Sequence, residues 1–179
     1  MNQPTAAPQN AAPPGQTLAI ARQPILDAKR AVFGYELFDR SAVGSSFSAA
    51  SDAALIFNLL CAADSEIQSS RKPLFINCTH QTLAGGHLEL IDPERVVLEI
   101  PALTIDQDSA EDIDAFQQTL AAVHKRGFRL AFDHRVLAPA YASWLALASF
   151  IKIDISCFTQ AQLFGLTRQL DKSSRAQLI

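Results

Sequence analysis

Three carboxylates and one amide fall within, or at the end of, short apolar runs that are spread along the chain. They are Glu36, Asn77, Glu99 and Asp133. Short apolar runs are typical of buried strands, and ligand sites in parallel α/β folds collect at the carboxyl ends of the strands. On neighbouring strands of one sheet, the four side chains would meet at one face. Their hard oxygen atoms suit Mg²⁺, Mn²⁺ or Ca²⁺ better than zinc, so the pattern indicates a divalent-cation site.

A lysine lies in the next apolar run, where Lys152 and Asp154 alternate. Beside carboxylates, a lysine can hold a phosphate or neutralise a charge that develops during a reaction. Each residue also has a purely structural interpretation. Asn77 could cap a strand end and Asp133 the next helix, while Glu99 could pair with Lys152 because a buried charge requires a partner. The residues alone leave both interpretations open.

The elements that would position these residues begin with two apolar runs, Leu18–Ile25 and Ala31–Phe38, separated by a polar turn. This spacing predicts a β-hairpin, and an apolar stripe from Ser48 to Ala63 predicts a helix. Strands and helices then alternate: strands are expected over Pro73–Cys78, Arg95–Ile100, Phe128–Asp133 and Phe150–Ile155, and helices over Thr79–Leu88, Ser109–Arg126, Ala138–Ala148 and Phe158–Leu170. Such alternation indicates βαβ units and a mostly parallel sheet. The residues Gln177–Ile179 resemble the beginning of one more strand.

Composition narrows the class of protein. Of the 179 residues, 49% are hydrophobic and 18% charged, which predicts a globular core. The net charge of −3 disfavours a nucleic-acid or membrane partner, because both need clustered positive charge. No apolar run reaches the roughly 20 residues of a membrane span, and no signal peptide is visible. We therefore expect a cytoplasmic protein whose Pro-rich residues 1–17 form a disordered leader.

Several short motifs then carry a family resemblance. They are Ala21-Arg-Gln-Pro-Ile25, Gly34-Tyr-Glu-Leu-Phe-Asp-Arg40, Phe75-Ile-Asn-Cys-Thr79, Pro93-Glu-Arg-Val-Val-Leu-Glu-Ile100, Lys125-Arg-Gly-Phe-Arg-Leu-Ala-Phe-Asp133 and Ile151-Lys-Ile-Asp154. In this order they resemble the EAL domains, the family of cyclic di-GMP phosphodiesterases, and most of all the divergent branch that is usually fused to an HDOD domain. The resemblance implies an α/β fold, a modified TIM-like barrel whose first strand runs antiparallel.

The length of the chain limits how much of that barrel it can form. A (β/α)₈ barrel typically takes about 250 residues. We therefore expect residues 18–179 to form an incomplete TIM-like (β/α) barrel of about six strands, a partial EAL-like domain without the family's last strands. Its open edge beside Phe150–Ile155 would favour self-association, unless Gln177–Ile179 pairs there.

The resemblance also assigns roles to single residues. It implies that Glu36, Asn77, Glu99 and Asp133 are metal ligands, that Lys152 lies near the attacking water, and that Gln23, Arg40 and Asp154 belong to the ligand-binding region. We expect the four metal-ligand positions to converge in one cluster. We also expect Lys152 to pair with one of its carboxylates in place of a missing second ion, on the same face as Asp154 by the two-residue period of a strand.

The chain departs from the family pattern where a second metal ion would bind. The signature reads Glu36-Leu-Phe rather than Glu-Ala-Leu, and Asp133-His-Arg-Val stands where the family has Asp-Asp-Phe-Gly. His134 thus replaces a bridging aspartate, and Arg135 adds positive charge where cations would lie. Two-metal hydrolysis needs both ions about 3.5–4 Å apart, so Lys152 would be a vestige of a catalytic residue.

These departures favour a degenerate EAL-like signalling domain that is catalytically inactive and acts as a binding or protein-interaction module in bacterial cyclic di-GMP signalling. Whether it is an enzyme is left open, leaning towards no. An active metal-dependent cyclic di-GMP phosphodiesterase is the alternative, and a purely structural interaction domain is the third. No cofactor is expected to be required, beyond one weakly bound Mg²⁺ or Mn²⁺. Cyclic di-GMP should bind no tighter than on the order of tens of micromolar, and a protein partner or a second copy is expected.

Overall fold

The computed structural model describes residues 20–39, 71–101, 110–173 and 175–179. The expected leader (1–17), the expected helix over 48–63 and the candidate ligand residue Arg40 lie outside the described residues.

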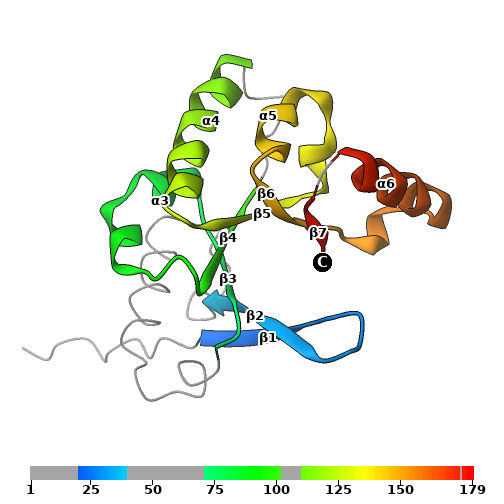
Figure 1. Ribbon diagram of the computed structural model, residues 1–179, viewed down its shortest axis with the longest axis horizontal. Coiled ribbons are helices and arrows are strands. Elements are labelled where there is room, and N and C mark those ends of the chain that lie inside the picture. The colour runs from blue at the N-terminus through cyan, green and yellow to red at the C-terminus, as the bar shows by residue number, and fades with distance from the viewer. Residues whose placement is uncertain (1–19, 40–70, 102–109, 174) are drawn as a thin grey trace, which may run out of the picture.

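The described residues form one sheet whose strands follow each other in sequence order (Figure 1). Its seven strands are β1 (Ile20–Leu26), β2 (Val32–Asp39), β3 (Leu74–Asn77), β4 (Val96–Ile100), β5 (Arg129–Asp133), β6 (Ala148–Lys152) and β7 (Gln177–Leu178). β1 and β2 pair antiparallel, and every later pair is parallel. The expected incomplete α/β barrel with an antiparallel first strand is therefore confirmed. It has seven strands rather than about six, because β7 pairs with β6 at the edge expected to be open.

The turn of the β1–β2 hairpin is closed by an aspartate. The Asp27 carboxylate accepts hydrogen bonds from the backbone N–H groups of Lys29 (2.8 Å) and Ala31 (2.9 Å). Arg30 takes a left-handed conformation with a φ of 63° between them. An Asx turn of this kind is the local chemistry that reverses the chain, and it sets Gln23 of β1 opposite Glu36 of β2.

Helices connect the parallel strands. They are α3 (His80–Ala84), α4 (Ala110–Lys125), α5 (Ala142–Leu145) and α6 (Gln160–Ser173), with 3₁₀ turns η1 (Gly86–Leu90), η2 (His134–Leu137), η3 (Pro139–Tyr141) and η4 (Ile155–Cys157). α4 is followed by Gly127, whose φ of 99° favours glycine. The expectation that Ala138–Ala148 is at least partly helical is confirmed: η3 and α5 follow each other over this range, and Ala148 already belongs to β6.

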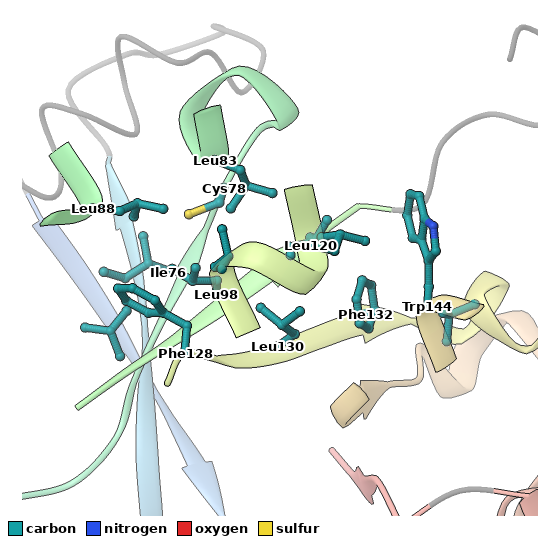
Figure 2. Close-up of a cluster of buried hydrophobic side chains, with 14 of the residues drawn as sticks. Ile76, Cys78, Leu83, Leu88, Leu98, Leu120, Phe128, Leu130, Phe132 and Trp144 are labelled. Carbon is teal, nitrogen blue, oxygen red and sulfur yellow. The ribbon is translucent and has the colours of Figure 1, made fainter. Parts of the chain in front are cut away.

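The two faces of the sheet carry different side chains, as the two-residue period of a strand requires. One face packs against α3, α4 and α5 through a large apolar core (Figures 1 and 2). Trp144 is completely buried there, and its indole N–H donates to the carbonyl of Ile113. The opposite, inner face carries a smaller cluster of buried residues: Phe75, Val97, Ala131 and Phe150. The candidate site lies on this inner face.

One expectation near the end of β6 is wrong. Asp154 was expected inside the strand, on the same face as Lys152, but β6 ends at Lys152 and Asp154 caps the turn η4. Its carboxylate accepts hydrogen bonds from Ser156 N (2.9 Å) and Ser156 Oγ (2.6 Å). Cys157 lies exposed in the same turn. A carboxylate that caps the following turn ends the strand, and the strand period no longer applies to it.

Candidate functional site

The strand period places the candidate residues on the inner face of the sheet. Asn77, Glu99, Asp133 and Lys152 each lie two positions after a member of the inner cluster: Phe75, Val97, Ala131 and Phe150. Because alternate residues of a strand share a face, these four polar side chains form a layer beyond the apolar one. Glu36 lies in register with Phe75 on the neighbouring strand. The sheet therefore does bring side chains from β2 to β6 to one face.

Lys152 bridges two glutamates that come from distant parts of the chain. Its Nζ lies 2.6 Å from Glu36 Oε1 and 2.6 Å from Glu99 Oε2. The lysine side chain is 39% exposed, whereas those of Glu36 and Glu99 are 11% and 6% exposed. The expected pairing of Lys152 with a carboxylate is confirmed, and it involves two carboxylates rather than one.

One ammonium shared by two carboxylates leaves an excess of negative charge, and the pKa values reflect it. Burial raises the pKa of Glu99 to about 7, while the charge and hydrogen bond of Lys152 act in the opposite direction; the nearby Glu36 adds to the rise. Burial alone would lower the pKa of Lys152, but both glutamates together raise it. The lysine therefore stays charged, and Glu99 exchanges a proton near neutral pH.

Asp133 is neutralised by a second cation, Arg135. The guanidinium Nε lies 3.0 Å and 3.1 Å from the two carboxylate oxygens, and Nη2 lies 2.5 Å from Oδ2. The backbone N–H of Arg135 also donates to Asp133 Oδ1 at 2.8 Å, which starts the turn η2. The hydrogen bond to Asp133 raises the pKa of the Arg135 guanidinium further. Asp133 is thus both a cap, as one interpretation of the sequence held, and half of an ion pair.

A cavity of about 160 Å³ opens between these residues. Its polar lining includes Asn77, Glu99, Asp133 and Lys152, while Cys78, Thr79, Ile100, Pro101, Ala131 and Phe132 complete the wall. Glu99 Oε1 is buried and has no hydrogen-bond partner in the part of the chain that the structure describes. The cavity is therefore partly polar, with one carboxylate oxygen left unsatisfied.

The remaining candidates lie around this centre. Gln23 is exposed and directly opposite Glu36. The ring of His134 packs edge-on against Phe158, with 4.7 Å between the ring centroids. Hydrogen bonds from Ser156 lower the pKa of Asp154, and His134 contributes to that shift. In this arrangement the Asp154 carboxylate is engaged as a cap.

Comparison with known proteins adds a relative and several structures. No family model matches the chain. The cyclic di-GMP phosphodiesterase CdgJ of Vibrio cholerae is 31% identical over 144 residues, which are 78% of this chain and 32% of that protein. The chain thus spans about a third of the relative's length.

Among solved structures, the manganese and cyclic di-GMP complex of Klebsiella pneumoniae BlrP1 superposes with a TM-score of 0.66 at 20% identity, covering 98% of this chain and 51% of BlrP1. Bacillus subtilis YkuI, which has an EAL domain and is bound to cyclic di-GMP and calcium, gives 0.64 at 19% identity, covering 88% and 47%. The EAL domain of Mycobacterium smegmatis DcpA gives 0.63 at 18% identity, covering 90% of this chain and 80% of that one. The chain has the fold of an EAL domain.

In this EAL-type fold, the residues do not fit a two-metal centre. The carboxylates are already paired with positively charged side chains. Lys152 binds Glu36 and Glu99, and Arg135 binds Asp133. Among the described residues, no three His, Cys, Asp or Glu side chains are arranged to hold a metal ion. The expected convergence of four ligands is thus met only in part: Lys152 joins the two glutamates, while Asn77, Glu99 and Asp133 share a cavity wall.

The sequence analysis identified the positive charge of Arg135 but missed its ion pair with Asp133. The signal was present in the spacing, because an Asp at a strand end followed two residues later by Arg can cap a turn and pair with the guanidinium at once. The apolar half of the cavity wall was also missed, because residues such as Ile100 and Phe132 resemble any other strand residues in the sequence. None of the described helices is both long and apolar enough to cross a membrane.

Proposed function

We propose that this EAL-type domain is a catalytically inactive signalling module, related to cyclic di-GMP phosphodiesterases, that binds its ligand without two-metal hydrolysis. One observation carries the proposal: the carboxylates at the site are paired with internal cations, Lys152 with Glu36 and Glu99 and Arg135 with Asp133. Two-metal catalysis needs the same oxygens to hold two ions that clamp the attacking and leaving oxygens.

The size of the cavity supports weak ligand binding. Sites that bury a drug-sized ligand enclose roughly 300–1,000 Å³, whereas this cavity has about 160 Å³. A cyclic dinucleotide could place only a part of itself there. We therefore propose that cyclic di-GMP binds on the order of tens of micromolar or more weakly, because little of its surface becomes buried.

An active phosphodiesterase is the second candidate. It is favoured by the relative from Vibrio cholerae, whose name is that of a cyclic di-GMP phosphodiesterase. In that case Mn²⁺ or Mg²⁺ would have to displace both internal cations. Membership of the HDOD-associated branch, a cytoplasmic location and a protein partner or self-association remain predictions.

Two measurements on the same sample separate these functions. Incubation with cyclic di-GMP and either Mn²⁺ or Mg²⁺, followed by chromatography, reports whether the linear dinucleotide forms. Titration calorimetry with cyclic di-GMP reports binding. We expect no product above the metal-only blank and weak binding. Product formation that depends on metal would overturn the proposal in favour of the phosphodiesterase, and submicromolar binding would overturn the weak site.

A further inference from the structure

The two internal cations differ in how firmly they are held, and Arg135 is the one open to solvent. Its side chain is 47% exposed, and Asp133 is 27% exposed. Donor and acceptor are two residues apart, on a strand end and the turn that follows it. Exposed ion pairs of this local kind contribute little to stability, typically about 0–1 kcal/mol. The contact can therefore be lost without disturbing the fold.

A carboxylate oxygen of Glu99, in the same cavity wall as Asp133, has no hydrogen-bond partner among the described residues. Glu99 is 5% exposed, and the oxygen is its Oε1. Glu99 lines the same cavity as Asn77 and Asp133. Leaving a buried carboxylate oxygen unpaired is costly, so this atom is a candidate ligand for a cation that enters the cavity.

These observations together point to a role for Arg135. We propose that Arg135 is an internal substitute for a divalent cation, and that its removal turns the wall formed by Asn77, Glu99 and Asp133 into a site for one divalent ion. The inference rests on the proposed function, in which the native side chains take the place of a metal pair. Arg135 delivers its charge through a planar fork to both oxygens of Asp133, which is the geometry in which a guanidinium competes best for a carboxylate.

The oxygen chemistry of the wall determines which ion would enter. An amide oxygen and two carboxylates are hard ligands, suited to Mn²⁺, Mg²⁺ or Ca²⁺. Lys152 continues to hold Glu36 and Glu99 Oε2, and this leaves Glu99 Oε1 and the oxygens of Asp133 on the cavity side. One ion rather than two is therefore expected.

Calorimetric titration of the full chain with Mn²⁺ tests the inference. We expect the wild-type chain to bind Mn²⁺ more weakly than roughly 1 mM, as in the weakest protein cation sites. Arg135→Gln should tighten binding at least about tenfold, because a charge-assisted bidentate competitor is gone. Arg135→Lys should fall between the two, since a lysine keeps the charge but not the fork.

Two matched variants make the outcome specific. Arg126→Gln removes the same charge from an exposed position near the opposite end of β5 and should bind Mn²⁺ like the wild type. The double variant Asp133→Asn with Arg135→Gln should lose the gain. A thermal melt with and without Mn²⁺ gives a second readout, in which only Arg135→Gln should be stabilised.

Equal Mn²⁺ affinity of Arg135→Gln and the wild type would overturn the inference, as would an equal gain in Arg126→Gln. This result is distinct from failure of the proposed function. Hydrolysis of cyclic di-GMP by the wild-type chain decides the proposed function, whereas the ratio of the two affinities decides the role of Arg135.

Discussion

The site pairs its carboxylates with cations in two ways. The two ways differ in how buried the carboxylates are and in how far apart the partners lie in the sequence. At the end of β5, Asp133 and Arg135 are two residues apart and partly exposed. Across the sheet, Lys152 joins Glu36 and Glu99, which are 116 and 53 residues away and nearly buried. The first contact forms wherever the turn forms, and the second forms only when β2, β4 and β6 are assembled. The local pair is therefore open to solvent, and the long-range triad belongs to the folded core.

Removal of Lys152 should have the largest effect. Lys152→Met leaves two nearly buried carboxylates without their ammonium, and breaking a buried ion pair from one side costs about 3–5 kcal/mol. Since Lys152 is 39% exposed, we expect a loss near the low end, about 3 kcal/mol. Urea unfolding at pH 8 in EDTA measures it, with Lys125→Met, an exposed lysine of α4, as the control. If Lys152→Met lowered the free energy of unfolding by less than about 0.5 kcal/mol, the Lys152 contact would be no stronger than an exposed ion pair such as Arg135–Asp133, and the comparison would fail.

The pH dependence should be next in size. The pKa of Glu99 is about 7 in the folded chain, above its ordinary value of 4.5. A raised carboxyl pKa contributes stability that is present below about pH 4.5 and is lost as the pH rises through 7. Glu99→Gln keeps the shape of the protonated carboxyl and removes the titration.

Urea unfolding between pH 5 and pH 8 should therefore show the wild type losing on the order of 2 kcal/mol relative to Glu99→Gln. The exposed Glu89→Gln serves as the control and should follow the wild type. A difference between wild type and Glu99→Gln that does not change with pH would mean that Glu99 does not take up a proton in this range.

Removal of Arg135 should have the smallest effect on stability. Its pair with Asp133 is exposed and local, so Arg135→Gln should change the free energy of unfolding by no more than about 0.5 kcal/mol. The same urea experiment in EDTA measures it. A loss as large as that of Lys152→Met would show that the β5 pair also belongs to the core, and the comparison would fail.

Much of the fold could be predicted because its patterns are local. Alternating apolar runs and helical stripes located β3, β4, β5 and α4, and two apolar runs separated by a polar turn located the hairpin. Prediction failed where a side chain redirects the backbone. Asp154 has the sequence context of a strand residue, and only its hydrogen bonds to Ser156 show that it caps a turn.

The site was predictable to the extent that the strand period determines it. That period placed Glu99, Asp133 and Lys152 on one face, and the charges predicted a pair with Lys152. The sequence did not indicate that Lys152 would hold two glutamates, because that depends on the distance between β2 and β4 across the sheet. Nor did it indicate that Arg135 would fold back onto Asp133 instead of pointing into solvent.

Crystals of the chain soaked in Mn²⁺ and cyclic di-GMP test the central claim most directly, through an anomalous difference map at the manganese edge. If internal cations have replaced the metal pair, Lys152 stays between Glu36 and Glu99, Arg135 stays on Asp133, and no two manganese peaks lie near each other. Two ordered ions about 3.5–4 Å apart, with Lys152 turned away from both glutamates, would contradict the account.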